Sequence, residues 1–436
     1  MDRELIDAIR ASAHLLGGGK RDHDPLLRMA RDARLVLLGE PTHGSHDVYR
    51  ERARITQRLI SELGFTGVVW EADWPDADRA GRWARAGGDD DDAKSALSGF
   101  ERFPTWMWRN TAVLEFLRWL RRWNESFPAA APRAGVYGMD LYSLYRSVQA
   151  VIRYLDEVDP AAAAQARERY ACFDHHGGDP QAYGYAARLG LTPECERAAL
   201  EQVEELRQRA ARDGDDAFSA EQNARLARNA EQYYRSLFGS RISSWNLRDR
   251  HMAETLEALL EHLSRRDGDA RLVVWAHNSH LGDARATEMG EEGELNVGAL
   301  VRERFGSEAL LVGFTTYDGT VTAAHEWDGG AERMLVSPAL PGSVEALFHD
   351  VALPRFFLPL RDPGEVLGAL REPRLERAIG VIYRPATERV SHYFHARVAE
   401  QFDAVVHLDR TRALEPLERK ARWQEPEPSE TYPSAL

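Results

Sequence analysis

The chain passes from the apolar run Leu35-Val36-Leu37-Leu38 into the polar segment Gly39-Glu40-Pro41-Thr42-His43-Gly44. A short apolar run without polar alternation is typical of a strand that is covered on both faces, as in a parallel sheet. Apolar residues then recur with helical spacing at Val48, Ile55, Leu59 and Leu63 until Gly64, and Ser45 is placed to cap that helix. This stretch therefore predicts a strand, a polar loop and an amphipathic helix in succession.

Similar apolar runs recur along the chain and alternate with long helical stretches. The further runs are Gly67–Trp70, Ala134–Tyr137, Leu272–Trp275, Leu310–Phe314, Phe356–Leu360, Ile379–Tyr383 and Ala404–His407. Alternation of buried strands with helices is the pattern of α/β proteins. We therefore predict an α/β fold with a mostly parallel central sheet, helices on both of its faces and large helical insertions.

Two connections are too long for simple crossovers between parallel strands. Residues 72–133 and 143–268 both read as helical inserts, and the second is broken near Cys172–Gly190 and again at Asp213–Asp216. We expect one domain over residues 1–423. The tail 424–436 is rich in Pro, Glu and Ser and is expected to be disordered.

The composition of the chain excludes several classes of partner. Lys and Arg total 56 and Asp and Glu total 70, so the formal net charge is 56 − 70 = −14. This acidic net charge argues against nucleic acid as a main partner, because phosphate binding needs a clustered basic surface. No apolar run approaches the roughly 18 residues of a membrane span, and charges at the N-terminus argue against a signal peptide. Cys172 and Cys195 alone cannot build a disulfide framework or a zinc cluster. We expect a cytoplasmic protein.

Four of the predicted strands end in polar residues of the types used in catalysis. These residues are Glu40 and His43 after the first strand, Glu71 after the second, Asp140 after the third, and His277 and His280 after the fourth. Ligands of open parallel sheets bind outside the carboxyl ends of the strands, where loops converge. If the four strands are parallel neighbours, these side chains share one cleft.

Several chemistries are disfavoured by missing motifs. The chain has no Gly-x-Ser-x-Gly elbow, neither cysteine follows a strand, and no glycine-rich phosphate or dinucleotide motif occurs. Histidines and carboxylates without a nucleophile suit general-base activation of water. They also suit a metal site, since both are ordinary zinc ligands, although His277-x-x-His280 lacks the helical context of a zincin.

Other candidate residues have both a structural and a functional interpretation. Arg52 is either a solvated helix charge among neighbouring arginines or a site residue. Asn246, Arg248 and Asp249 precede a long helix in our reading, and capping explains Asn246 or Asp249 equally well. Seven of the eleven tryptophans lie between Trp70 and Trp123. Those near predicted loops, which are Trp74, Trp106 and Trp108, are candidates to line the cleft.

Taken together, these motifs resemble the erythromycin esterase family. The similarity begins at Gly39-Glu40-x-Thr42-His43-Gly44 with Arg52, and it extends in order to the closing region, so it covers nearly the whole chain. The later matches are Glu71, Gly138-x-Asp140, Trp245-Asn246-x-Arg248-Asp249, Trp275-Ala276-His277-Asn278-x-His280, Ser391-His392-Tyr393-Phe394 and Phe402-Asp403.

The resemblance implies a hydrolase that acts on the lactone ester of macrolide antibiotics, and hence a role in antibiotic resistance. His43 would be the general base that activates water, and Glu40, Arg52, Glu71, His277 and His280 would complete the catalytic cleft. Predicted substrate-binding residues are Trp74, Trp106, Trp108, Asp140 and Asn278. We expect a bulky lactone or ester as substrate, with no cofactor and no metal. The alternatives are a metal-dependent hydrolase using His43, Glu71, His277 and His280 as ligands, or a protein of the same fold that is associated with polysaccharide (succinoglycan) biosynthesis or binding and lacks macrolide activity.

Overall fold

A computed structural model describes residues 2–128, 131–176, 178–191, 195–237, 240–361 and 364–418. Within these residues, eight strands form the central sheet. In spatial order they are β1 (His14–Leu15), β9 (Arg355–Pro359), β12 (Ala404–Leu408), β6 (Ala309–Thr315), β2 (Leu35–Leu38), β5 (Leu272–Trp275), β3 (Gly67–Asp73) and β4 (Gly135–Asp140). The strands from β12 to β4 are all parallel, whereas β9 is antiparallel to both β12 and β1. The predicted mostly parallel α/β sheet is confirmed.

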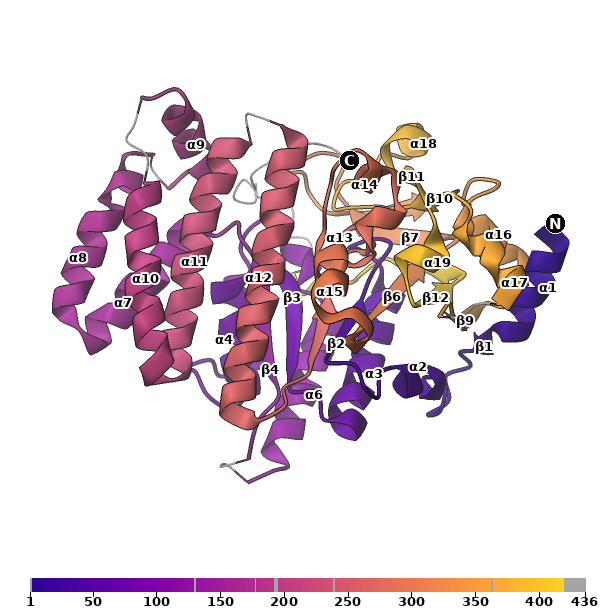
Figure 1. The fold of residues 1–436 in the computed structure, drawn as a ribbon, viewed down its shortest axis with the longest axis horizontal. Coiled ribbons are helices and arrows are strands. Elements are labelled where there is room, and N and C mark those ends of the chain that lie inside the picture. Colours follow the sequence, from indigo (N-terminus) through magenta and orange to yellow (C-terminus); the bar gives the residue numbers. More distant parts are fainter. Residues whose placement is uncertain are drawn as a thin grey trace.

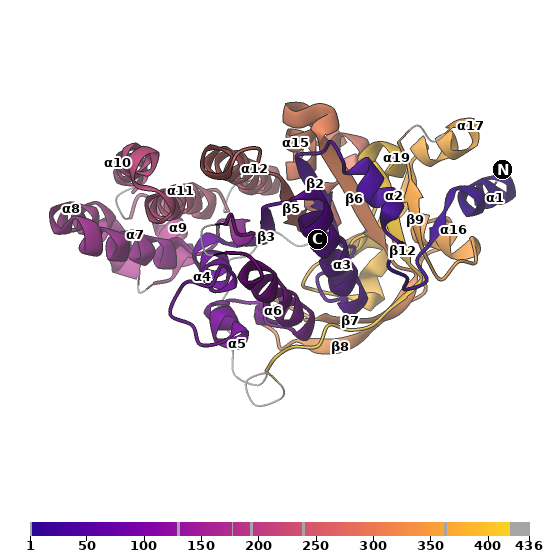
Figure 2. The same cartoon turned by 90° about the horizontal axis from the view of Figure 1, so that it is seen from below.

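Both faces of the sheet are covered by helices, which explains the unbroken apolar runs. Leu35 and Leu37 of β2 belong to one hydrophobic core, and Val36 and Leu38 belong to the core on the opposite face. Figure 2 shows α3 (His46–Leu63) and α6 (Thr111–Glu125) on one side, with α12 (Arg241–Asp267) and α15 (Val297–Phe305) on the other. Successive side chains of a strand point to opposite faces, so a doubly covered strand must be apolar at every position.

Helix α3 follows β2 as the sequence predicts, but its start differs in one detail. Its last residue is Leu63, and Gly64 ends it in the left-handed region at φ +70°. Ser45 occupies the N-cap position, yet its Oγ accepts no hydrogen bond from the first turn and is buried without a partner. The predicted side-chain cap is therefore wrong, although the boundary is right.

The two long connections contain the predicted helices. Residues 72–133 hold α4 (Trp74–Ala84), α5 (Ala93–Ala96) and α6, and residues 143–268 hold α7 (Leu144–Val158), α8 (Pro160–Tyr170), α9 (Pro180–Arg188), α10 (Glu196–Asp213), α11 (Asp215–Ser236) and α12. In Figure 1 helices α7, α8, α10 and α11 extend beyond the β4 edge of the sheet. The two cysteines, Cys172 and Cys195, form a disulfide within this helical region. The one-domain organisation over 1–423 stays a prediction, and the tail 424–436 lies outside the described residues.

One predicted strand is wrong. The run Ile379–Tyr383 adds no strand to the central sheet and makes only two isolated bridges, between Thr42 and Ile379 and between Ala324 and Ile382. It connects the loop after β2 with the end of β7 (Asp318–Ala323), and its Ile379 and Tyr383 side chains are buried in a small separate core with residues of β7 and of the strand paired with β7, outside the central sheet. Periodicity alone cannot distinguish these two environments.

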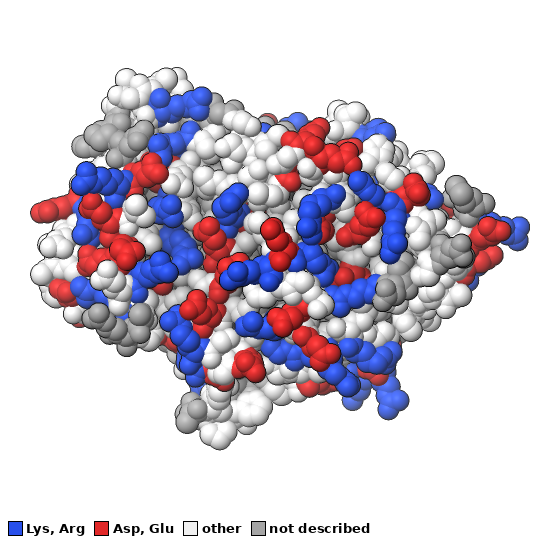
Figure 3. All heavy atoms as spheres, in the orientation of Figure 1, with Lys and Arg blue, Asp and Glu red and all other residues white. Residues whose placement is uncertain are grey.

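The remaining elements are mostly short. The other strands are β8 (Glu332–Val336), β10 (Arg374–Arg377), β11 (Tyr393–Ala396) and β13 (Arg410–Thr411), and the other helices are α1 (Asp2–Ser12), α2 (Asp24–Met29), α13 (Asn278–Leu281), α14 (Glu288–Glu291), α16 (Val344–Asp350), α17 (Gly364–Leu367), α18 (Glu388–Ser391) and α19 (Val398–Gln401). None of the helices among the described residues has the length and apolarity needed to cross a membrane. Acidic and basic side chains are interspersed over the face drawn in Figure 3.

Candidate active site

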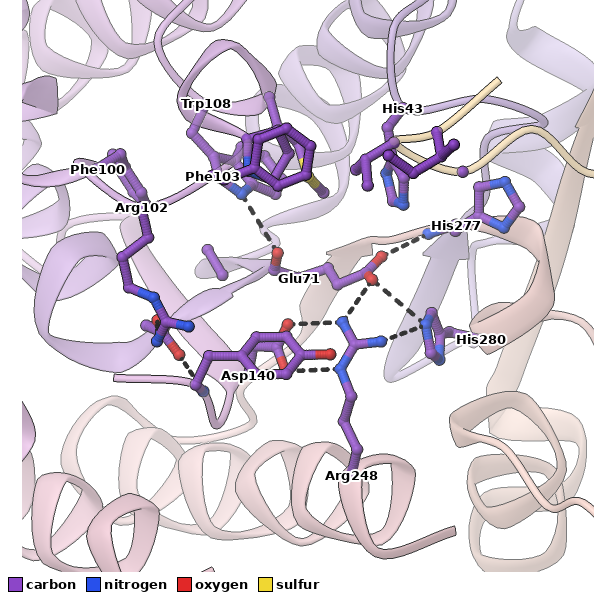
Figure 4. Close-up of a pocket in the computed structure, with 18 of the residues that line it drawn as sticks. His43, Glu71, Phe100, Arg102, Phe103, Trp108, Asp140, Arg248, His277 and His280 are labelled. Atoms are coloured by element: carbon purple, nitrogen blue, oxygen red, sulfur yellow. Dashed lines mark hydrogen bonds and ion pairs between the residues drawn. The ribbon is translucent and has the colours of Figure 1, made fainter. Parts of the chain in front are cut away.

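The four strands that end in polar residues, β2, β5, β3 and β4, are parallel neighbours in the sheet. Their carboxyl ends open on a pocket with a volume of about 180 Å³ (Figure 4). The sequence-predicted residues on its wall are His43, Glu71, Trp108, Asp140, His277 and His280. The topology therefore brings together five of the six side chains that were expected to share a cleft, and the sixth, Glu40, lies buried outside the pocket lining.

The loop that carries His43 is held against β7 by a close backbone contact. A Cβ at Gly44 would lie 1.8 Å from the carbonyl oxygen of Thr322, so a side chain at that position would clash with backbone. The Thr322 amide donates a hydrogen bond to the Gly44 carbonyl at 3.0 Å. Glycine at this position therefore allows the loop to reach the place where His43 faces the pocket.

A buried chain of three residues supports His43. Its Nδ1–H donates to Glu40 Oε1 at 2.8 Å, and Arg52 Nη2 donates to Glu40 Oε2 at 2.8 Å. Glu40 and Arg52 are fully buried and do not line the pocket. The Arg52 guanidinium lies over the rings of Tyr49 and Trp275, at 4.3 and 5.1 Å from their centroids. Arg52 is thus not a solvated helix charge; it neutralises the carboxylate that orients His43.

A second buried network lies across the pocket and is centred on Arg248 of α12. Its Nη2 donates to Glu71 Oε1 at 2.8 Å and to Asp140 Oδ2 at 2.7 Å, and its Nε donates to Asp140 Oδ1 at 2.9 Å (Figure 4). Burial raises the pKa of Glu71, but the charges of His280, His43 and Arg248 outweigh burial and hold that pKa well below its usual range. Glu71 is therefore an anion at neutral pH.

The two histidines after β5 differ in their pKa. Burial, reinforced by the nearby His43, lowers the pKa of His277 to about 3, so this ring is neutral. Its backbone amide donates to Glu71 Oε2 at 2.8 Å, and its ring centroid lies 4.9 Å from that of His43. Burial also lowers the pKa of His280, but the carboxylates of Asp249 and Glu71 outweigh it and raise the pKa to about 9. The pKa values of these two rings are therefore shifted in opposite directions.

Three predicted substrate-binding residues lie away from the pocket lining. Trp74 is buried in the core and donates from Nε1 to Ser219 Oγ at 3.0 Å. Trp106 is also buried in the core. Asn278 donates to the Phe314 carbonyl at 2.7 Å and accepts from the Phe314 amide at 3.2 Å, so it joins the loop after β5 to β6. Among the predicted tryptophans, Trp108 alone lines the pocket, within the described residues.

Sequence reasoning missed much of the pocket wall. Asn246, Arg248 and Asp249 lie inside α12, which begins at Arg241, so neither Asn246 nor Asp249 caps that helix. Arg248 lines the pocket, and the other unassigned lining residues include Phe100, Arg102, Phe103, Met107, Tyr142, Trp245, Trp327, Val381 and Ile382. The available signal for Trp245, Arg248 and Asp249 was their place in the family motif. Most of the other aromatic and aliphatic lining residues come from loops and carry no local signal.

The described part of the chain contains no group of three or more His, Cys, Asp or Glu residues arranged to hold a metal ion. His280, a ligand in the metal-dependent alternative, has Nδ1 on Asp249 and Nε2 at 2.9 Å from the Arg248 guanidinium. The Arg248 cation thus lies where His280 and Glu71 converge. Among the described residues, the metal-dependent alternative therefore has no set of side chains arranged as ligands. The expectation that hydrolysis needs no metal stays a prediction.

The sequence of this chain is similar to the sequences of two named proteins. The chain is similar to YbfO of Bacillus subtilis strain 168, whose name provisionally assigns it to the hydrolases, with 21% identity over 88% of this chain and 85% of that protein. It is also similar to the erythromycin esterase type II of Escherichia coli, with 19% identity over 90% of this chain and 93% of that protein.

Solved structures share the fold at similarly low identity. A crystal structure of a succinoglycan biosynthesis protein matches with a TM-score of 0.78 and 20% identity, covering 95% of this chain and 98% of that one. A Bacillus cereus protein matches with a TM-score of 0.80 and 21% identity, covering 96% and 100%. A mutant of the erythromycin esterase EreC in its open conformation matches with a TM-score of 0.65 and 16% identity, covering 90% and 94%.

The family comparison spans most of the chain. The model of the erythromycin esterase family matches residues 60–411, a stretch that runs from α3 to β13 and contains Glu71, Asp140, Arg248, His277 and His280. The fold, the order of the motifs and this match agree, and the chain belongs to the erythromycin esterase family.

Proposed function

We propose that the protein hydrolyses carboxylic esters, and that His43 activates the attacking water. The observation that carries this proposal is the Glu40–His43 hydrogen bond on the wall of the pocket. With Nδ1–H donating to Glu40, the neutral ring keeps its lone pair on Nε2. A carboxylate that fixes the tautomer of a histidine and stabilises its imidazolium is the arrangement that general-base catalysis requires.

The reaction then proceeds without a covalent enzyme intermediate. His43 Nε2 takes a proton from water as the water oxygen bonds to the ester carbonyl carbon, which places negative charge on the carbonyl oxygen. Collapse of this tetrahedral species breaks the carbon–oxygen bond to the alcohol, and the proton returns from His43 to the leaving alkoxide. The Arg248–His280 pair on the pocket wall supplies positive charge for the oxyanion. Arg52 acts through Glu40 because it is fully buried behind that carboxylate.

The substrate class follows from the rest of the pocket wall. Phe100, Phe103, Met107, Trp108 and Trp327 form an apolar surface beside the charged network. The cavity of about 180 Å³ is smaller than the roughly 300–1,000 Å³ typical of drug-sized ligands. In our proposal the ester edge of a bulky lactone of the macrolide type enters this cavity while the rest of the ring stays in the open mouth. A small-molecule partner, with no nucleic acid or membrane, and a cytoplasmic location are part of the same proposal.

A substrate panel tests this proposal directly. Purified protein is incubated with macrocyclic lactones and with small aryl esters, with and without a chelator, and products are followed by mass spectrometry. We expect a mass gain of one water for at least one lactone, and cleavage that persists after chelation. If none of the esters reacts, the proposal is wrong. If activity is lost on chelation and restored by zinc, the metal-independent mechanism is wrong.

A further inference from the structure

Strand β2 leaves the central sheet just before the proposed general base. It lies between β5 and β6 (Figure 2), and its pairing with β6 ends at the Gly39 amide, which donates to the Val312 carbonyl at 2.9 Å. In a continued parallel ladder, the next donor from this strand would be residue 41, and its acceptor would be the Phe314 carbonyl. Residue 41 is a proline without an N–H group, so β2 cannot make this bond.

The side chain of Asn278 takes the position that β2 leaves free beside β6. Its Nδ2 donates to the Phe314 carbonyl at 2.7 Å, and its Oδ1 accepts from the Phe314 amide at 3.2 Å. The buried carboxamide thus pairs with β6 as a main-chain peptide group would. A Cβ at Gly39 would lie 2.1 Å from Asn278 Oδ1, so glycine at that position leaves the room that the carboxamide needs.

The main chain of Asn278 is bonded to the residue that orients His43. The Asn278 amide donates to the Glu40 carbonyl at 2.9 Å, and the next carbonyl, that of Pro41, accepts from the Ile379 amide at 2.8 Å, outside the central sheet. The carboxylate of Glu40 then accepts from His43 Nδ1. A continuous set of hydrogen bonds therefore runs from β6 through Asn278 and Glu40 to His43.

We propose that Asn278 is a positioning residue that holds Glu40 where its carboxylate meets His43; this inference rests on the proposed role of His43 in ester hydrolysis. The carboxamide anchors Asn278 to β6, and the Asn278 amide carries that fixed position to Glu40. Asn278 lies outside the pocket lining, so it acts through Glu40 and does not touch the substrate. With Glu40 on Nδ1–H, the Nε2 lone pair of His43 stays available for a proton of water.

Two variants of Asn278 test this role. Asn278→Ala removes the carboxamide. Asn278→Asp keeps the side-chain volume and an acceptor for the Phe314 amide, but it loses the donor to the Phe314 carbonyl and places a second carboxyl group beside Glu376, whose Oε1 lies 3.5 Å from Nδ2. Asn124→Ala is the matched control, because the buried Asn124 pairs in the same way with the amide and the carbonyl of Ala134, at 3.0 and 2.9 Å, outside the pocket lining.

The tautomer of His43 provides a readout that needs no ester substrate. Protein labelled with nitrogen-15 in its histidine rings is measured by NMR at a pH at which this ring is neutral, and the His43 signals are assigned by their loss in His43→Asn. We expect the Nδ1–H tautomer in the wild type and in Asn124→Ala. Both Asn278 variants should show a mixture of the Nδ1–H and Nε2–H tautomers, because the carboxylate no longer selects one of them.

Steady-state kinetics provide the second readout. The Asn278 variants should lower kcat by about 10²-fold with KM nearly unchanged, since a small misplacement of a catalytic group has an effect of this size. Asn124→Ala should lower stability and leave kcat and KM unchanged. A purely structural Asn278 would behave like Asn124, with lower stability and no change in the tautomer of His43.

Gly39→Ala approaches the same contact from the other side. Its methyl group would clash with Asn278 Oδ1, whereas without the carboxamide the nearest remaining atom is the Val312 carbonyl oxygen at 3.3 Å. We expect Gly39→Ala to lower kcat as Asn278→Ala does, and the double variant to be no worse than Asn278→Ala alone. Losses that multiply in the double variant would contradict the proposal.

The outcomes separate the two proposals. If the wild type cleaves no ester, the proposed function fails, while the tautomer of His43 still decides the role of Asn278. An unchanged Nδ1–H tautomer in folded Asn278→Ala overturns the positioning role, as does an Nε2–H tautomer in the wild type. If Asn278→Ala does not fold, the same readout on Asn278→Asp and Gly39→Ala decides.

Discussion

Arg248 donates a hydrogen bond from Nη2 to Glu71 Oε1 over 2.8 Å, although 177 positions separate the two residues in the chain. The contact joins α12 to the end of β3, and the same guanidinium also binds Asp140 at the end of β4. The helical insert 143–268 therefore contributes directly to the pocket and is not only a cover for the sheet. A planar guanidinium with several donors can bridge two carboxylates in this way, which a lysine cannot.

Replacing His43 by Asn should lower kcat by about 10²–10⁴-fold while leaving KM and folding nearly unchanged, because the variant loses the proton acceptor. Steady-state kinetics on whichever ester the protein cleaves best provide the measurement. His395→Asn is the control, since His395 is half exposed on the surface and pairs with Glu288. Turnover within a few-fold of wild type in a folded His43→Asn protein would remove His43 from the mechanism.

Replacing Arg52 by Met should destabilise the protein by about 3–5 kcal/mol, because it leaves the buried Glu40 carboxylate without its cation. Urea unfolding at pH 7 measures the change. The double variant Arg52→Met with Glu40→Gln should regain much of that stability but not the activity, since His43 would still lack a carboxylate partner. Equal instability of the single and double variants would show that Glu40 is not the group that Arg52 neutralises.

Replacing Trp327 by Ala should raise KM for a bulky lactone several-fold and change KM for a small aryl ester little, because Trp327 lines the pocket next to Phe103, with ring centroids 5.6 Å apart. Apolar contact area is lost only for a substrate large enough to reach that wall. Leu335→Ala is the control, since Leu335 is 72% exposed and lies outside the pocket lining. Equal effects on both substrates would contradict the proposed placement of the large ring.

The Glu376→Gln variant should lose less stability than the wild type when the pH is raised from low values to pH 7 to 8. Burial, together with the nearby carboxylate of Glu345, raises the pKa of Glu376 to about 8. A folded-state pKa above the unfolded value of 4.5 means that stability is full below pH 4.5 and is lost progressively as the pH rises to about 8. Thermal unfolding of both proteins between pH 4.5 and 8.5 measures this difference; parallel curves would show that Glu376 is ionised in the folded state at neutral pH.

The local pattern of apolar residues was sufficient to predict the strands at whose carboxyl ends the pocket lies. The runs Leu35–Leu38 and Leu272–Trp275 match β2 and β5 residue for residue, because a strand buried on both faces must be apolar at every position. The same reasoning placed Glu40, His43, His277 and His280 just beyond strand ends. It failed for Ile379–Tyr383, where an equally apolar segment is buried in a small core beside β7 and β8, because burial inside a sheet and burial against the side chains of a sheet leave the same composition.

The order of residues along the chain by itself determined most strands of the central sheet, the helical inserts and the polar residues at or just beyond the strand ends. Only the tertiary structure decided the charge and the partners of those side chains. The spatial order β2-β5-β3-β4 places the His277 amide on Glu71 across 206 positions, and the docking of α12 brings Arg248 and Asp249 to that site. The physical reason is that a local pattern reports which face of an element is apolar, whereas the effective charge of a buried histidine or carboxylate depends on groups that folding brings within hydrogen-bond distance from distant parts of the chain.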